Sequence, residues 1–236
     1  MSLQIKNLNK CFGPLKVYEN FDLEIEKNKI TVILGPSGCG KTTLLKMLSG
    51  IVDVDSGQIE GIEDNSISYL FQEERLLPWM TLAENIEFVL KSHMDEVAVK
   101  ERVNQYLSLV KLVGFENYYP HEVSGGMKQR VAIARAFAYP SDILLMDEPF
   151  KGLDPKLKQE MTNVFIRLWS EDRRTVVYIT HDVDEALMLG NIVYVFSQTP
   201  VKIIEKMEIH SPHKERLECD KCVRKEKEQL ARELMS

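Results

Sequence analysis

The chain has no apolar run near the length that crosses a bilayer. Its longest apolar stretches have the size of β-strands, whereas a transmembrane helix needs about 20 consecutive apolar residues. The first residues, Met-Ser-Leu-Gln-Ile-Lys, also lack the charged and then apolar layout of a secretory signal. We therefore expect a soluble chain.

Cysteine is scarce, with 4 in 236 residues, which argues against an oxidised disulfide scaffold. Near the C-terminus, two histidines and two cysteines have the spacings H-x-x-H and C-x-x-C, which zinc ligands can have. The surrounding residues 214–232 are strongly charged and typical of an exposed terminal helix, so coincidence is favoured and metal binding there stays an open question. The four residues are His210, His213, Cys219 and Cys222.

Excess positive charge is absent as well. The formal net charge is −6 and the pI is near 5.5, which argues against nucleic acid as a partner. No motif occurs in a second copy. A chain of 236 residues is long enough for one large α/β core with a helical insertion.

A glycine-rich loop, residues 35–43, carries the first chemical signal. It lies between an apolar β-rich run and a helical segment, as the pattern G-x-x-x-x-G-K-[ST] requires. Its backbone N–H groups and the start of the helix suit phosphate. Lys41 is predicted to reach the β- and γ-phosphates, Thr42 to bind Mg²⁺, and Thr43 to contact the α-phosphate side. The predicted phosphate cradle also contains Ser37, Gly38, Cys39 and Gly40.

An acidic pair after an apolar strand carries the second signal. The apolar residues 143–146 precede Asp147 and Glu148, and such a strand delivers the next side chains to the carboxyl edge of a parallel sheet. We expect Asp147 to hold Mg²⁺ and Glu148 to act as general base toward the water that attacks the γ-phosphate. The alternative for Glu148 is a helix-capping or surface carboxylate.

A second helix start suited to phosphate occurs at Ser124, followed by Gly125 and Gly126. This segment resembles the signature sequence of ABC-type ATPases, Leu-Ser-Gly-Gly-Gln, with Val123 and Met127 at its first and last positions. Taken alone, the segment suits an ordinary serine N-cap. Its place between the phosphate loop and the acidic strand favours the signature.

Further residues match motifs of this family in the expected order, and the resemblance implies their roles. Phe12 corresponds to the aromatic residue that stacks on adenine, and Val17 is expected to pack against the same nucleoside. Gln72 corresponds to the glutamine that contacts Mg²⁺ and the attacking water, and His181 to the switch histidine that hydrogen-bonds the γ-phosphate. For Phe12, a plain core role is the alternative.

Asp154 resembles the D-loop aspartate of the family. Here the chain departs from the usual pattern, because Lys151 and Gly152 stand where small residues are usual.

Four segments narrow the resemblance to importer ATPases for nitrate, sulfonate, taurine and thiamine precursors: residues 71–85, 119–122, 124–127 and 181–186. The apolar residues around Trp79 suit a docking groove for a partner helix. The alternative, that Trp79 anchors the core of the helical subdomain, is about equally favoured.

The fold class implied is α/β: a P-loop NTPase (RecA-like) core with a mainly parallel sheet, an N-terminal antiparallel β-subdomain and an inserted α-helical subdomain. The N-terminal strands are expected to flank the phosphate-loop strand. We predict one ABC ATPase domain over residues 1–236. Residues 1–79 and 141–209 form its core, about 80–140 the helical subdomain, and about 210–236 a charged tail.

The resemblance implies an ATP-hydrolysing importer subunit at the cytoplasmic face of the cell membrane. Two chains, a homodimer or a pair with a similar ATPase, are expected to hold two Mg-ATP between the phosphate loop of one and the Ser124 turn of the other. Transmembrane permease subunits and, indirectly, a solute-binding protein are the implied partners. The transported solute and the preference for ATP over GTP stay open.

Two other classes compete with the importer. The first is an ABC ATPase with a regulatory or mechanical role that is not coupled to transport, and co-purification with a multi-span membrane protein separates it from an importer. The second is a nucleotide kinase, which shares the loop but has no reason to carry the Ser124 turn. A DNA-repair ATPase of the superfamily would need a long coiled coil, and no such heptad run occurs.

Overall fold

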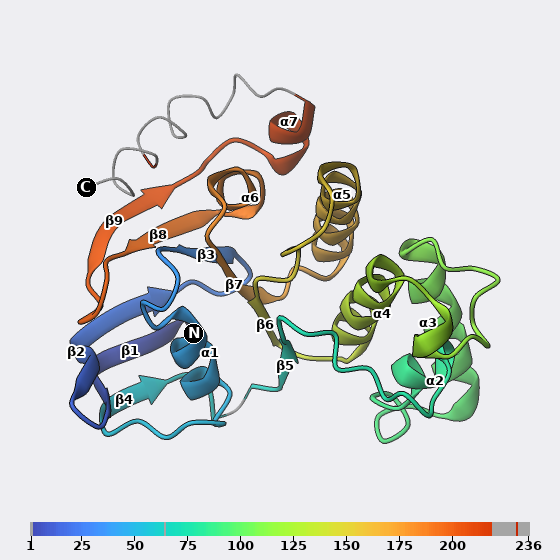
Figure 1. The fold of residues 1–236 in the computed structure, drawn as a ribbon, viewed down its shortest axis with the longest axis horizontal. Helices are drawn as coiled ribbons and strands as arrows, with labels where there is room; N and C mark the ends of the chain where they lie inside the picture. Colours follow the sequence, from blue (N-terminus) through green and yellow to red (C-terminus); the bar gives the residue numbers. More distant parts are fainter. Residues whose placement is uncertain (1, 64, 219–229, 231–236) are drawn as a thin grey trace.

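The computed structural model describes residues 2–63, 65–218 and 230. The described chain begins with an antiparallel pair of strands, has a run of helices near its middle, and alternates strands and helices from β6 to β8 (Figure 1). The strands are β1 (Leu3–Phe12), β2 (Leu15–Ile25), β3 (Ile30–Leu34), β4 (Ser56–Glu60), β5 (Ile67–Leu70), β6 (Ile143–Asp147), β7 (Thr175–Thr180), β8 (Ile192–Phe196) and β9 (Ile203–Glu208). The helices are α1 (Lys41–Leu48), α2 (Leu82–Glu87), α3 (Glu96–Leu109), α4 (Gly125–Ala138), α5 (Pro155–Asp172), α6 (Val183–Leu189) and α7 (His213–Glu218), with a 3-10 turn η1 (Pro120–Glu122).

The main sheet has the strand order β5-β6-β7-β3-β8-β9 in the described part of the chain. All neighbours in it are parallel except β9, which runs antiparallel to β8. Every residue of β3, β6, β7 and β8 is buried, as expected for strands that are covered on both faces. The predicted, mainly parallel sheet is confirmed.

Successive side chains of these strands enter two different cores. Ile33, Leu145 and Val177 pack on the face that is covered by α1 and the small N-terminal sheet. Their neighbours Val32 and Leu144 pack on the other face, in the core shared with α4, α5 and α6. Figure 1 shows these helices grouped on one side and the small sheet on the other.

The N-terminal strands pair antiparallel to each other, as predicted, but they do not lie beside β3. β1 and β2 are antiparallel, and with β4 they form a separate sheet of order β2-β1-β4. The neighbours of β3 are β7 and β8, so the expectation that the N-terminal strands flank the phosphate-loop strand is wrong. The reason lies in the side chains of β2. This strand alternates buried and exposed residues from Phe21 to Ile25, whereas a strand beside β3 must be apolar on both faces.

Helices α2, α3 and α4 contact one another and stand apart from the small sheet in Figure 1. Side chains cap each of them: Thr81 and Glu84 form a capping box at α2, Asp95 caps α3, and Ser124 caps α4. The division of the chain at about residues 80 and 140 stays a prediction. None of the helices in the described ranges combines the length and apolar character that crossing a bilayer requires.

Candidate functional site

The parallel strands bring the predicted site residues to one edge of the sheet. In the register of the sheet, Leu34 lies beside Thr180 and Asp147 beside Ile179, so the loops after β3, β6 and β7 leave together. The register of Leu70 beside Met146 adds the loop after β5. The phosphate loop, the acidic pair, His181 and Gln72 therefore follow neighbouring strand ends, where open α/β sheets bind ligands.

The phosphate loop owes its shape to two glycines in the left-handed region. Gly38 has φ 80° and Gly40 has φ 119°, values that residues with a Cβ rarely adopt. A Cβ on Gly40 would also lie 2.6 Å from Cγ1 of Val17. Ser37 is exposed and Cys39 is buried, while the helix after Gly40 begins directly with Lys41.

Lys41 is the first residue of α1, directly after the loop. Its Nζ donates to the carbonyl oxygens of Gly35 and Pro36, both over 2.8 Å, and the residue is 5% exposed. A buried ammonium held by two neutral carbonyls keeps its positive charge uncompensated, which suits an anionic ligand such as the β- and γ-phosphates.

Thr42 and Asp147 form an oxygen-donor pair. Thr42 Oγ1 donates to Asp147 Oδ1 over 3.0 Å, and Tyr69 Oη lies 3.5 Å from Asp147 Oδ2. Burial raises the pKa of Asp147, and the hydrogen bond from Thr42 offsets part of this effect. A hydroxyl and a carboxylate in a partly dry site fit the ligand preference of Mg²⁺, and a cation would also compensate the buried charge.

Glu148 and His181 meet beside this pair. Glu148 Oε1 lies 3.2 Å from His181 Nδ1, and Glu148 has a positive φ of 46°, which turns its side chain away from the direction that Asp147 takes. Burial raises the pKa of Glu148, but its contacts with Lys151 and His181 outweigh burial and hold it below its usual value. The carboxylate is therefore ionised at neutral pH, as a general base must be.

The other predicted nucleotide contacts differ in accessibility. Gln72 is exposed. Phe12 is 48% exposed, and Nζ of Lys10 lies over its ring, 5.3 Å from the ring centroid. Val17 is 4% exposed and lies under the phosphate loop rather than at the surface. The roles of these three residues in nucleotide binding stay predictions.

The Ser124 turn is not brought to the phosphate loop of its own chain. Helix α4 contacts α2, α3, α5 and β5, whereas α1 contacts β6 and β7, and Figure 1 shows β5 and β6 between α4 and α1. Ser124 Oγ accepts from the N–H of Met127 over 3.3 Å. Ser124 is exposed, whereas a Cβ on Gly126 would lie 2.6 Å from the side chain of Leu157. Asp154 caps α5 through the N–H groups of Lys156 and Leu157.

A group of charges behind His181, in which Glu185 is buried and Lys158 and Asp182 are partly buried, was missed from the sequence. Lys158 pairs with Asp182 and, over 2.6 Å, with Glu185. Glu185 also accepts from the hydroxyls of Tyr178 and Thr180 over 2.9 and 2.7 Å. This network fixes the turn that carries His181 to the first turns of α5. An available signal was the acidic pair Asp182 and Glu185 at the start of a helix, which needs a cation if it is buried.

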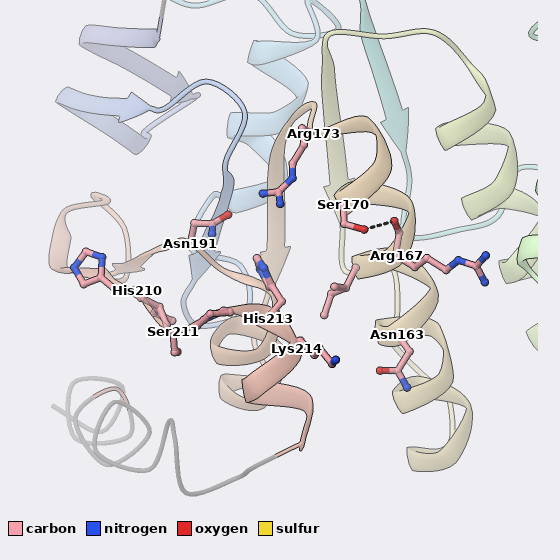
Figure 2. Close-up of a pocket in the computed structure, with 12 residues that line it drawn as sticks. Asn163, Arg167, Ser170, Arg173, Asn191, His210, Ser211, His213 and Lys214 are labelled. Carbon is pink, nitrogen blue, oxygen red and sulfur yellow. Dashed lines mark hydrogen bonds between the residues drawn. The ribbon is translucent and has the colours of Figure 1, made fainter.

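A groove of about 590 Å³ lies at the opposite edge of the sheet, where Arg173 precedes β7 and Asn191 precedes β8. Figure 2 shows that the imidazoles of His210 and His213 lie well apart along it. His213 Nε2 donates to the carbonyl of Leu189 over 2.7 Å. Within the described residues, no three His, Cys, Asp or Glu side chains are arranged to hold a metal ion. The other two tail residues with ligand spacing, Cys219 and Cys222, lie outside the described residues.

The fold and the loop define a P-loop nucleotide-binding cassette. The sequence profile described as "ABC transporter" matches residues 18–151. The chain is 39% identical over 223 residues to the aliphatic sulfonates import ATP-binding protein SsuB of a Bacillus cereus strain, a match that covers 90% of this chain and 88% of that protein. The chain belongs to the ABC transporter family, and the predicted resemblance is confirmed.

Solved structures of ABC cassettes have the same fold as this chain. A dimeric bacterial ABC transporter cassette matches with a TM-score of 0.78 and 27% identity, covering 89% of this chain and 100% of the other. The post-hydrolysis state of that cassette bound to ADP and Pi matches with a TM-score of 0.76, 27% identity and the same coverage. The predicted fold class is confirmed.

Proposed function

We propose that this protein is the ATP-binding and ATP-hydrolysing subunit of an ABC importer, acting as a pair of chains that encloses two Mg-ATP. The observation that carries the proposal is that these groups share one edge of the sheet. There, Thr42 Oγ1 lies 3.0 Å from Asp147 Oδ1, and Glu148 Oε1 lies 3.2 Å from His181 Nδ1. Its similarity to a sulfonate-import ATP-binding protein supports the importer class and makes an organic anion the first solute to test.

The roles of the residues follow from their places. Lys41 and the loop N–H groups bind the phosphates, and Thr42, Gln72 and Asp147 hold Mg²⁺, which supplies charge neutralisation when it is bound. Glu148 takes the proton of the attacking water as the water oxygen bonds to the γ-phosphorus. The bond to the bridging oxygen breaks with its electron pair leaving on ADP. His181 hydrogen-bonds the γ-phosphate.

The second chain supplies the rest of the site. Because α4 is separated from α1 by β5 and β6 within one chain, Ser124 and Gly126 suit the phosphate of a partner copy. A head-to-tail pair places each Ser124 turn over the opposite phosphate loop. The dimeric state of the similar cassette supports this arrangement. Membrane subunits at the cytoplasmic face would receive the motion.

The test uses the variant Glu148→Gln of the full chain. With Mg-ATP it is expected to lose about 10²- to 10⁴-fold of the hydrolysis rate, since general-base catalysis contributes this much, and to form a stable dimer in light scattering. The control Lys100→Gln, an exposed residue of α3, is expected to hydrolyse ATP normally. A Glu148→Gln protein with the normal rate contradicts the base assignment. A variant that stays monomeric at saturating Mg-ATP contradicts the two-chain site.

A further inference from the structure

His181 depends on its backbone for its position. Its side chain is 51% exposed, so the packing of neighbouring side chains restricts the ring little. Its Nδ1 lies 3.2 Å from Glu148 Oε1, and Glu148, His181 and Lys158 line one small cavity at the sheet edge. The direction of the ring is therefore set mainly by the turn of residues 180–182, between β7 and α6.

The residues on both sides of His181 are hydrogen-bonded to Glu185. Thr180 Oγ1 donates to Glu185 Oε2 over 2.7 Å and accepts from the Asp182 N–H over 3.0 Å. Asp182 Oδ1 accepts in turn from the Glu185 N–H over 3.2 Å. The turn is thus closed around a carboxylate of a residue that is 6% exposed.

Lys158 compensates the two negative charges of this turn. Its Nζ contacts Asp182 Oδ2 and, over 2.6 Å, Glu185 Oε1. Two carboxylates that meet at one ammonium would repel each other without it, and burial of Glu185 strengthens this repulsion. The ammonium therefore holds both carboxylates, and with them the turn, against helix α5.

Helix α5 gives Lys158 a fixed support. Asp154 caps the start of this helix. Met161 and Phe165, one and two turns beyond Lys158, are buried in the core that α5 shares with α4 and α6. A functional group is held more precisely when its support is a packed helix than when it is a loop. The ion pairs of Lys158 thus connect the turn around His181 to the core.

We propose that Lys158 is a positioning residue for hydrolysis: it holds the turn of residues 180–182 in the conformation that directs His181 to the γ-phosphate. This inference rests on the proposed function, in which His181 hydrogen-bonds that phosphate. Loss of Lys158 is expected to slow the chemical step, because His181 is then no longer held in place. Binding of ATP is expected to change little, since Lys41 is held by two carbonyls of its own loop.

The experiment compares Lys158→Gln, which removes the charge, with Lys158→Arg, which keeps it, in the full chain. Hydrolysis of radiolabelled Mg-ATP measures kcat and KM. For Lys158→Gln, kcat is expected to fall about tenfold, within the loss that misplacement of a reacting group causes, while KM for ATP stays within about twofold of the parent value. Lys158→Arg is expected to keep most of the parent kcat, since a guanidinium can also pair with two carboxylates.

A second background separates positioning of His181 from a general structural role. In His181→Gln, the further change Lys158→Gln is expected to lower kcat by less than about twofold, because a residue that acts through the imidazole has no effect once the imidazole is gone. An equal fractional loss in both backgrounds overturns the inference. A parent kcat in Lys158→Gln overturns it as well.

The controls concern folding and net charge. Asp182→Asn keeps an oxygen for the N–H groups at the start of α6 but removes one charge that faces Lys158. If urea unfolding shows that Lys158→Gln is not folded under the assay conditions, Asp182→Asn takes its place, with a smaller loss of kcat and the same dependence on the His181 background expected. Lys100→Gln removes a lysine charge from an exposed site on α3 and is expected to hydrolyse ATP normally.

The variant His181→Gln alone separates the two levels of the argument. If it loses hydrolysis while Lys158→Gln behaves like the parent chain, the role of His181 stands and the role of Lys158 falls. If His181→Gln hydrolyses ATP at the parent rate, the role that the proposed function gives to His181 falls, and the inference falls with it.

Discussion

His213 is a side chain that the fold keeps neutral. It packs edge to face on Trp169 at a ring-centroid distance of 5.2 Å and donates to the Leu189 carbonyl. Burial lowers the pKa of His213 to about 4, the nearby charges of Arg216 and Arg173 act in the same direction, and the hydrogen bond to Leu189 opposes them. Protonation of this imidazole therefore opposes folding.

The stability of the fold is expected to depend on pH through His213. The unfolded chain binds this proton with a pKa near 6.5 and the folded chain with a pKa of about 4. The stabilisation that the neutral His213 imidazole contributes is therefore complete above the unfolded pKa, and it is lost as the pH falls toward the folded pKa of about 4. The slope is at most about 1.4 kcal/mol per pH unit. Urea unfolding across this window measures it, and His213→Gln is expected to make the dependence of stability on pH shallower by the part that His213 contributes. Equal pH dependence in both proteins would show that His213 is not the group responsible.

The positions of single residues were predictable from the sequence where a motif places them at the end of a strand or in the loop that follows it. Asp147 ends β6, and Lys41 lies at the end of the loop that follows β3, so the parallel sheet brings both to one edge. Lys158 and Glu185 were not predictable in the same way, because their contact depends on how α5 packs against the turn after β7. No local pattern encodes that packing, although burial of Glu185 requires some partner.

The sequence predicted which segments form strands better than it predicted which strands pair with one another. Apolar runs identified β3, β6 and β7 because each is buried on both faces. An N-terminal antiparallel β-subdomain was predicted, but β4 as its third strand was not, since β4 is short and mostly exposed and gives no apolar alternation. Strand partners depend on long-range contacts, which periodicity does not record.

The loop between β5 and α2 depends on one buried amide. Asn85 is 0% exposed. Its Oδ1 accepts from the Leu77 N–H over 2.7 Å, and its Nδ2 lies within 3.2 Å of the carbonyl oxygens of Leu77, Met80 and Thr81. This amide therefore holds residues 77–81 in place next to the segment that follows Gln72.

Asn85→Asp is expected to destabilise the protein by about 3 kcal/mol. The substitution keeps the acceptor for Leu77 but replaces the amide donor with an oxygen that faces three carbonyl oxygens, so a buried negative charge lies without a counter-charge against three other acceptors. Urea unfolding at neutral pH measures the loss. Asn104→Asp, the same change at an exposed position of α3, is expected to change stability by less than about 0.5 kcal/mol. Similar losses in both variants would mean that the amide network does not hold the loop.

The assembled molecule presents an apolar side chain at the tip of this loop. Trp79 is 69% exposed, so the alternative that it anchors the core of the helical region is wrong for this structure. Its loop is joined to α4 through Arg135, which donates to the carbonyl oxygens of Glu74 and Arg75 over 2.8 and 3.0 Å. A partner that binds Trp79 would thus contact the loop that follows Gln72. This loop is bonded to α4, the helix that Ser124 caps.

Trp79→Ala is expected to weaken binding of the membrane subunits by about 2 kcal/mol, roughly thirtyfold, because an exposed tryptophan that becomes buried is a typical hot spot. The measurement is titration of the purified chain onto membrane subunits in detergent or nanodiscs. Leu15→Ala serves as control, since Leu15 is 52% exposed and lies on β2, away from the helices α2 to α4 in Figure 1. If both variants bind with the affinity of the parent chain, the Trp79 loop is not the docking surface. If no membrane protein co-purifies with any of the three, a regulatory or mechanical ATPase becomes the better assignment.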